Sequence, residues 1–492
     1  MKTLLIWMSL AAAAVTFAAA PTPQPNMVLI IADDLAWDDV GAFGHPTIKT
    51  PHIDRLAREG MLFERAFVTA SSCSPSRSSL ITGRYPHGTD AEQLHWPLPA
   101  EQVTFVEHLR AAGYWTAVAG KWHLGPAVRD RFDEIREADP AGYMLAAGAK
   151  AGATKMSMAQ SGDIQSGCAD WVPLLRARPR ERPFFVWLAA LDPHRDYEEN
   201  IAPQPTKPAE VVVPRHLPDT PGVRRELALY HDEVERLDRF VGAVLAELAA
   251  QGVADNTLVV FLSDNGRPFP RDKTTVFEGG IRTPLIVRWP GHARAGTRCA
   301  QLVSTVDFAP GFLAAAGLKP PASIQGVSFL PLLAEPGRPV RSEIFAEQNW
   351  HDYEQRTRAV RTVDFKLVVH DYPDLPLTPG ADVVRGIEYR EMQRLRELGQ
   401  LTPEQQQCFL APRASRELYD LRSDPVEFHN VAGDPAYAGV LADLAARLEA
   451  WKKATNDVAP TRRTADEFDR TTGNPLPNRK RPRASKAEML GR

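Results

Sequence analysis

Short apolar runs that end in polar side chains recur through the first half of the chain. They span residues 27–31, 114–119, 184–190 and 257–262; a further strand is predicted over residues 61–68, and helix-like segments alternate with these strands. Continuous apolar runs are typical of strands that are buried on both faces of a sheet. Alternation of such strands with helices predicts a largely parallel sheet covered by helices on both faces. We therefore expect an α/β fold.

Several helices are marked by their end signals. Thr50, Pro51 and Gly60 have the residue types of an N-cap, a first turn and a C-terminal stop. Thr104 and Glu107 have the spacing of a capping box. A longer helix ends near Gly252, and a stripe at three- and four-residue spacing predicts its core-facing side: Val223, Leu227, Tyr230, Val234, Leu237, Val241, Val244 and Leu248. Residues 126–170 show weak periodicity and are predicted to be loops with short helices.

The pattern changes near Ser342. Short runs at 343–347, 357–363, 366–369 and 417–421 predict antiparallel strands, and residues 435–451 predict a closing amphipathic helix. We expect a large α/β domain over residues 26–340, a smaller α+β domain over 341–458 with an antiparallel sheet, and a polar basic tail over 459–492.

The first 20 residues have the features of an export signal. Lys2 precedes an apolar run to Phe17, and small residues follow to Ala20. The run is too short and too rich in alanine for a transmembrane helix. We expect an exported protein, periplasmic or secreted, without stable membrane insertion. A formal charge of -3 on 492 residues gives no indication of nucleic-acid binding, and the four cysteines match no zinc-binding spacing.

Acids and bases follow the predicted strands at their carboxyl ends. In open α/β sheets ligands bind beyond this edge, so these side chains are expected to converge. Two of the groups supply oxygen ligands alone, which favours calcium or magnesium over zinc. The residues concerned are Asp33 and Asp34, Lys121 and His123, His194, and Asp264 and Asn265.

Cys73 lies where a helix is predicted to begin. Pro75 suits a first turn, and Gly83 suits a C-terminal stop. Free backbone N–H groups and the helix dipole favour an anion at such a position. Arg77, one turn later, is expected on the same face as Cys73. The arrangement suggests a nucleophile that acts on an anionic group.

These residues also carry a family resemblance. The segment C-S-P-S-R from Cys73 to Arg77, followed by L-I-T-G-R, resembles the signature of type I sulfatases, in which a separate maturation enzyme oxidises the cysteine to Cα-formylglycine. The segments G-K-W-H, D-P-H, S-D-N-G and E-G-G-I-R-T-P resemble the same family, and the spelling is closest to heparan N-sulfatase (sulfamidase) and its bacterial relatives. The resemblance implies an alkaline-phosphatase-like fold and hydrolysis of a sulfate ester or sulfamate on a sulfated carbohydrate.

The resemblance also implies roles for individual residues. It places calcium, with magnesium less favoured, on Asp33, Asp34, Asp264, Asn265 and the modified Cys73. A hydrated formylglycine would attack the sulfur atom, and His194 or Lys273 would protonate the leaving group. His123 would remove the proton whose loss expels sulfate. The full implied catalytic set is Cys73, Arg77, Lys121, His123, His194 and Lys273.

Substrate identity stays open at this point. Lys273 stands where the mammalian sulfamidase pattern has an arginine, so both N-sulfated and O-sulfated sugars remain candidates. His95, His351 and Asp352 lie in predicted loops and are candidate substrate-binding residues. Two alternatives remain: a phosphate or phosphonate ester hydrolase of the same fold, and a non-catalytic binder of sulfated glycans.

Overall fold

An eight-stranded sheet forms the centre of the computed structural model, which describes residues 24–138, 163, 165–477 and 479. The strand order is β4-β3-β5-β1-β6-β7-β2-β8, and β7 alone among these strands pairs antiparallel with both of its neighbours. The prediction of a mostly parallel sheet is therefore confirmed. The strands are β1 (Asn26–Ala32), β2 (Met61–Phe67), β3 (Trp115–Gly120), β4 (Glu134–Glu137), β5 (Phe184–Ala189), β6 (Thr257–Ser263), β7 (Leu285–Arg288) and β8 (Thr297–Ser304).

The central strand β1 sets the geometry of the edge at which the candidate site residues lie. All seven of its residues are buried, and it pairs in parallel with β5 and β6. The register places Ala32 opposite Ser263, so Asp33 and Asp264 leave neighbouring strands at the same level. The backbone N–H of Asp33 donates to the carbonyl of Asp192 at 2.9 Å. Three strand ends are thus joined at one edge.

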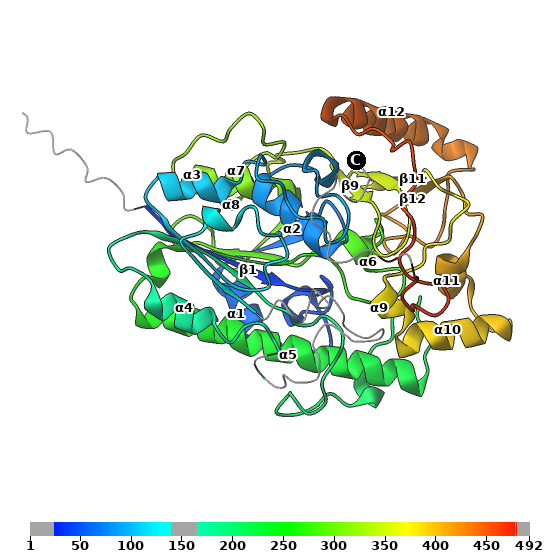
Figure 1. Cartoon of the computed structure of the whole chain (residues 1–492), viewed down its shortest axis with the longest axis horizontal. Helices are drawn as coiled ribbons and strands as arrows, with labels where there is room; N and C mark the ends of the chain where they lie inside the picture. Colours follow the sequence, from blue (N-terminus) through cyan, green and yellow to red (C-terminus); the bar gives the residue numbers. More distant parts are fainter. Residues whose placement is uncertain (1–23, 139–162, 164, 478, 480–492) are drawn as a thin grey trace, which may run out of the picture.

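Helices cover both faces of this sheet (Figure 1). The helices α1 (Pro51–Glu59), α4 (Trp171–Ala177) and α5 (Pro221–Ala250) pack on one face. The helices α2 (Cys73–Thr82), α3 (Phe105–Ala111), α7 (Phe308–Ala315) and α8 (Pro331–Ala334) pack on the other, and the short α6 (Glu278–Ile281) precedes β7. All eight predicted stripe residues of α5 are at most 1% exposed, which confirms the core-facing side of that helix.

A second, antiparallel sheet lies on the right of Figure 1, and its strand β9 contacts β8 of the large sheet. Its order is β12-β11-β10-β9, and the strands are β9 (Ile344–Gln348), β10 (Thr357–Arg361), β11 (Phe365–His370) and β12 (Arg416–Asp420). The helix α12 (Ala438–Thr455) buries Leu444, Leu448 and Trp451 against it. This confirms the predicted smaller antiparallel sheet and closing helix, whereas the domain limits 26–340, 341–458 and 459–492 stay predictions.

Some elements have no clear sequence signal. The strand β4 lies within the stretch predicted as loops, and its four residues are all partly exposed, so no apolar run marks this edge strand. The strands β7 and β8 were not predicted either, since one has four residues and the other begins with exposed polar ones. Three helices between β11 and β12 also lack a predicted counterpart: α9 (Ala381–Val384), α10 (Ile387–Glu397) and α11 (Pro403–Gln406).

The remaining predictions concern the two ends of the chain and the four cysteines. The predicted export signal at 1–20 and residues 478 and 480–492 of the predicted basic tail lie outside the described residues. No helix in the described part of the chain combines the length and apolarity needed to cross a bilayer. All four cysteines are buried, and none forms a disulfide: Cys73, Cys168, Cys299 and Cys408.

Gly120, at the end of β3, packs closely against the backbone of the neighbouring strand β5. Its φ is +100°, and a Cβ there would lie 1.8 Å from the carbonyl oxygen of Ala189. We expect Gly120→Ala to lower the free energy of unfolding in urea by more than about 2 kcal/mol, because left-handed strain and a backbone clash add together. Gly113→Ala is the matched control, since its φ is +94° but nothing lies within 4 Å. Equal losses in both variants would contradict the clash.

The stability contributed by the junction between the two sheets should depend on pH. Glu278 of α6 lies 3.3 Å from both Arg361 of β10 and Lys366 of β11. Burial raises its pKa, but the charges of Arg361 and Lys366 outweigh burial and lower the pKa from 4.5 to about 2. A folded pKa below the unfolded one means that the ionised group stabilises the fold above about pH 4.5. This contribution is lost as the pH falls from there toward 2.

We therefore expect the free energy of unfolding of the wild type to fall more steeply below pH 4.5 than that of Glu278→Gln. Urea unfolding at a series of pH values between 3 and 7 measures both slopes. Parallel pH profiles for the two proteins would show that the Glu278 carboxylate does not carry this effect.

Candidate active site

Cys73 is the first residue of α2 and lies at the carboxyl edge of the large sheet. It is 2% exposed, and its Sγ is 3.5 Å from Oδ1 of Asp33 and 3.9 Å from Oδ1 of Asp34. The helix ends at Gly83, which has a left-handed conformation with φ of +66°. The structure therefore places the cysteine at a helix N-terminus, as predicted. Burial raises the pKa of the Cys73 thiol well above its ordinary value.

Arg77 lies one turn further along α2 and is fully buried. Its Nε donates to Oδ2 of Asp264 at 2.9 Å, and its Nη1 donates to the carbonyl of Lys121 at 3.3 Å. These bonds join the start of α2 to the ends of β6 and β3. Since a buried cation needs compensation, Asp264 and Arg77 hold each other in place.

Three carboxylates are crowded beneath Cys73. Asp33, Asp34 and Asp264 are at most 1% exposed. Burial, with Asp33 and Asp264 adding repulsion against the attraction of Lys273, raises the pKa of Asp34 to about 7. Burial likewise raises the pKa of Asp264. A cluster of this kind favours a further positive charge among the carboxylates.

The donor set fits a hard divalent cation. Asn265 donates from Nδ2 to Oδ1 of Asp34 at 2.6 Å, while its own Oδ1 is buried and accepts no hydrogen bond from the described residues. Ligand atoms of Asp33, Asp34, Cys73 and His194 lie within 4.8 Å of one another. Carboxylate oxygens and an unsatisfied amide oxygen are the groups that calcium prefers.

Two lysines flank the carboxylates. The Nζ of Lys121 donates to Oδ2 of Asp33 at 2.5 Å, and the Nζ of Lys273 donates to Oδ2 of Asp34 at 2.6 Å. Both side chains are buried. Burial lowers the pKa of Lys273, but Asp34 and its neighbours outweigh it and raise the pKa well above the ordinary value. Two ammonium groups and a helix N-terminus therefore surround Cys73 and favour a bound anion.

His194 faces the same cluster from the loop after β5. Its Nδ1 lies 2.6 Å from the carbonyl of Arg195, so this nitrogen carries a proton and donates. Its Nε2 lies 3.6 Å from Oδ2 of Asp34. A partly exposed imidazole nitrogen therefore points at the space beside Cys73.

Two further predicted residues form a pair. His123, which follows β3, places its Nε2 2.7 Å from Nδ1 of His95. The backbone N–H of His95 donates to the hydroxyl of Ser74 at 2.8 Å. The structure thus brings both histidines next to the residue that follows Cys73.

The segment after β9 closes the other side of the site. The Nδ1 of His351 lies 2.8 Å from the hydroxyl of Ser72, and Oδ2 of Asp352 accepts the backbone N–H of Ala381 at 3.0 Å. Asp382 was not predicted, because a single acid in a segment without periodicity carries no signal. Its Oδ2 lies 3.8 Å from Nζ of Lys273 and 3.9 Å from Nε2 of His194.

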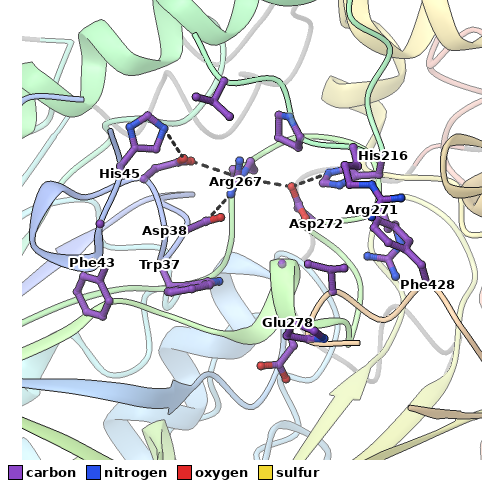
Figure 2. A pocket seen from close by; sticks show the side chains of 18 of the residues that line it. Trp37, Asp38, Phe43, His45, His216, Arg267, Arg271, Asp272, Glu278 and Phe428 are labelled. Carbon is purple, nitrogen blue, oxygen red and sulfur yellow. Dashed lines mark hydrogen bonds and ion pairs between the residues drawn. The ribbon is translucent and has the colours of Figure 1, made fainter. Parts of the chain in front are cut away.

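The segment between Asn265 and Lys273 also lines a second cavity, of about 360 Å³, which none of the side chains around Cys73 enters. Figure 2 shows Arg267 at its centre, between Asp38 and Asp272. The Nε2 of His216 donates to Oδ2 of Asp272 at 3.2 Å. Arg267 is therefore paired with an acid on either side.

A metal site in this second cavity is disfavoured. Asp39, His45 and His231 lie close enough to hold an ion. However, Nδ1 of His45 accepts the N–H groups of Thr47 and Ile48 at 3.3 and 3.0 Å. Burial and the charge of Arg267 lower the pKa of His45 to about 4, so the neutral ring keeps its proton on Nε2. That nitrogen then has no lone pair for a metal.

A helix N-terminus, buried cations and an acidic cluster thus meet at one edge of the sheet, an arrangement that suits a tetrahedral anion. A family model described as "Sulfatase" matches residues 25–318, and one described as "N-sulphoglucosamine sulphohydrolase, C-terminal" matches residues 269–375. The chain therefore belongs to the sulfatase family of sulfuric ester hydrolases. The predicted family membership is confirmed.

Several proteins are similar over most of their length. Human N-sulphoglucosamine sulphohydrolase is 31% identical over 472 residues, covering 88% of this chain and 90% of that protein. An ulvan-active sulfatase of Formosa agariphila is 29% identical and covers 89% of this chain and 76% of that protein. A structure solved in complex with its substrate D-glucosamine-2-N,6-O-disulfate has a TM-score of 0.68 at 22% identity, and the match covers 89% of this chain and 99% of that chain. This last likeness supports the fold.

Proposed function

We propose that the protein hydrolyses a sulfate ester or sulfamate of a sulfated sugar, with Cys73 converted to Cα-formylglycine and calcium bound beside it. The observation that carries this proposal is Cys73 at the start of α2, between the acidic cluster and the ammonium groups of Lys121 and Lys273. The named activities of the human and Formosa relatives support a sugar substrate.

Calcium would be held by Asp33, Asp34, Asp264 and Asn265, whose oxygens fit a hard cation. When bound, it supplies positive charge that polarises a sulfate oxygen and favours a deprotonated nucleophile. Arg77 orients Asp264 and closes the buried end of the site.

The remaining side chains bind the sulfate and move protons. Lys121 and Lys273 bind sulfate oxygens once these displace their present carboxylate contacts. The Nε2 of His194 donates a proton to the leaving group, because Nδ1 already donates to a carbonyl and leaves Nε2 for the substrate. His123, held by His95, accepts the proton whose removal expels sulfate and restores the aldehyde.

Export and maturation belong to the same proposal. Residues 1–20 direct the protein out of the cytoplasm, and a formylglycine-generating enzyme is the partner that modifies Cys73. His95, His351 and Asp352 are proposed to contact the sugar, since each is joined to the Cys73 segment or to α9 by a hydrogen bond.

The proposal is tested by mass and by substrate. Protein expressed together with a formylglycine-generating enzyme is digested with trypsin, and the fragment Ala66–Arg77 is weighed. We expect the mass of an aldehyde or its hydrate at Cys73. The same preparation is assayed on glucosamine N-sulfate, glucosamine 6-sulfate and the corresponding phosphate esters. Faster cleavage of the phosphate esters would indicate a phosphoesterase. If the modified protein binds the sulfated sugars without cleaving them, it is a glycan binder.

A further inference from the structure

The candidate site has a buried end and a partly exposed end, and we expect different parts of a substrate to bind at each. Asp33, Asp34 and Asp264 are at most 1% exposed, and Cys73 is 2% exposed. The sulfate group must reach this buried end, because the nucleophile and the metal ligands are there. The sugar must then occupy the outer end, where the side chains of His194 and Asp382 are 13% and 23% exposed.

Asp382 is the carboxylate at this outer end. Its Oδ2 lies within 4 Å of both Lys273 and His194, the two groups proposed to meet the sulfate and the leaving oxygen. Its Oδ1 accepts no hydrogen bond from any described residue. That oxygen is buried beside Gly380, whereas Oδ2 lies beyond hydrogen-bond distance of both cations, so Oδ2 offers the lone pair for a donor that comes with the substrate.

The position of Asp382 is held by its neighbours. Asp352 accepts the N–H of Ala381, and His351 is joined to Ser72, so the start of α9 is tied to the Cys73 segment. A Cβ on Gly380 would lie 2.6 Å from Oδ1 of Asp382 and 3.2 Å from Nε2 of His351, so a larger residue there would have to shift both side chains.

We propose that Asp382 is a substrate-binding residue that accepts a hydrogen bond from the hydroxyl or N–H group next to the sulfated position of the sugar. This inference rests on the proposed sulfatase function. An anionic acceptor bonds strongly to a hydroxyl and repels a second sulfate at the same place. Asp382 thus selects a sugar that carries one sulfate with a free donor beside it.

The test combines an enzyme variant with a substrate change. The sulfated monosaccharide that the wild type cleaves best is compared with its analogues in which a neighbouring hydroxyl is replaced by hydrogen. For one of these deoxy analogues, we expect the wild type to lose roughly 10- to 100-fold in kcat/KM. In Asp382→Ala, the same replacement should change kcat/KM by less than about 2-fold.

The outcomes separate the alternatives. If Asp382 acts only by positioning Lys273 or His194, Asp382→Ala loses the same factor on both substrates, and the proposal is overturned. A second arm uses the sugar that also carries a sulfate on the neighbouring oxygen. The ratio of kcat/KM on this disulfated sugar to kcat/KM on the monosulfated sugar should be higher for Asp382→Asn than for the wild type. An unchanged ratio also counts against the proposal.

Controls distinguish folding and function. Asp371→Ala removes an equally exposed carboxylate, 23%, that pairs with Arg356, and it should leave the substrate preference unchanged. Thermal unfolding of each variant reports folding, and Asp382→Asn preserves the shape of the side chain if the alanine variant unfolds. Failure of the modified wild type to cleave any sulfated sugar would remove the proposed function itself, a result distinct from an unchanged preference in the variants.

Discussion

Replacing Cys73 with alanine is expected to lower kcat by at least about 10⁴-fold, because the change removes the side chain from which the nucleophile is made. The alanine variant should still fold, since Cys73 is small and its Sγ makes only long contacts, at 3.5 and 3.9 Å, with Asp33 and Asp34. Turnover of the best sulfated sugar measures the first expectation, and thermal unfolding measures the second.

Cys168→Ala is the matched control for this loss. Cys168 is also a buried free cysteine, at 1% exposure, but its Sγ contacts the carbonyl of Ser166. We expect this variant to keep kcat within about 3-fold of the wild type, because a small buried side chain away from the reacting atoms affects packing. Comparable activity of Cys73→Ala and Cys168→Ala would disprove the role of Cys73.

Calcium is expected to stabilise the folded protein as well as to activate it. At a free concentration about 100 times its Kd, calcium should raise the free energy of unfolding by about 2.7 kcal/mol, since the ion binds only the folded site. Chelation should reverse this increase and abolish turnover. Asp34→Asn should lose most of the increase, because it removes a charged oxygen from the centre of the cluster. Chemical unfolding with and without calcium measures each value.

Asp39→Asn controls for the loss of a buried acid. Asp39 is 2% exposed, and burial raises its pKa to about 7, as for Asp34, yet it lies beside Arg267 in the second cavity. This variant should retain the full stabilisation by calcium. Equal calcium responses of Asp34→Asn and Asp39→Asn would place the ion elsewhere, and stabilisation by magnesium alone would change the identity of the metal.

The strands and helices that carry strong local patterns agree with the predictions. The apolar runs of β1, β3, β5 and β6 and the stripe of α5 are found within a residue or two of their predicted limits. The strands β4 and β7 were not predicted. Each has only four residues, and β4 is held at the sheet edge by pairing with β3. Such short elements depend on neighbours that lie far away in sequence.

The candidate site residues divide in a similar way. The residue types at Cys73, Arg77, Asp33 and Asp34 were evident because a motif and a strand end are local features. Asp382 was missed because its importance comes from contacts with Lys273 and His194, across separations that no local pattern encodes.

The sequence by itself determined which segments become buried strands, where the helix begins at Cys73, and which reactive side chains stand at strand ends, because apolar periodicity and end signals act over a few residues. The tertiary structure alone decided which of these groups meet. The ion pair between Lys273 and Asp34 joins residues 239 positions apart, and the pair of His95 with His123 joins two separate loops. Such contacts follow from strand order and packing, which are properties of the whole chain.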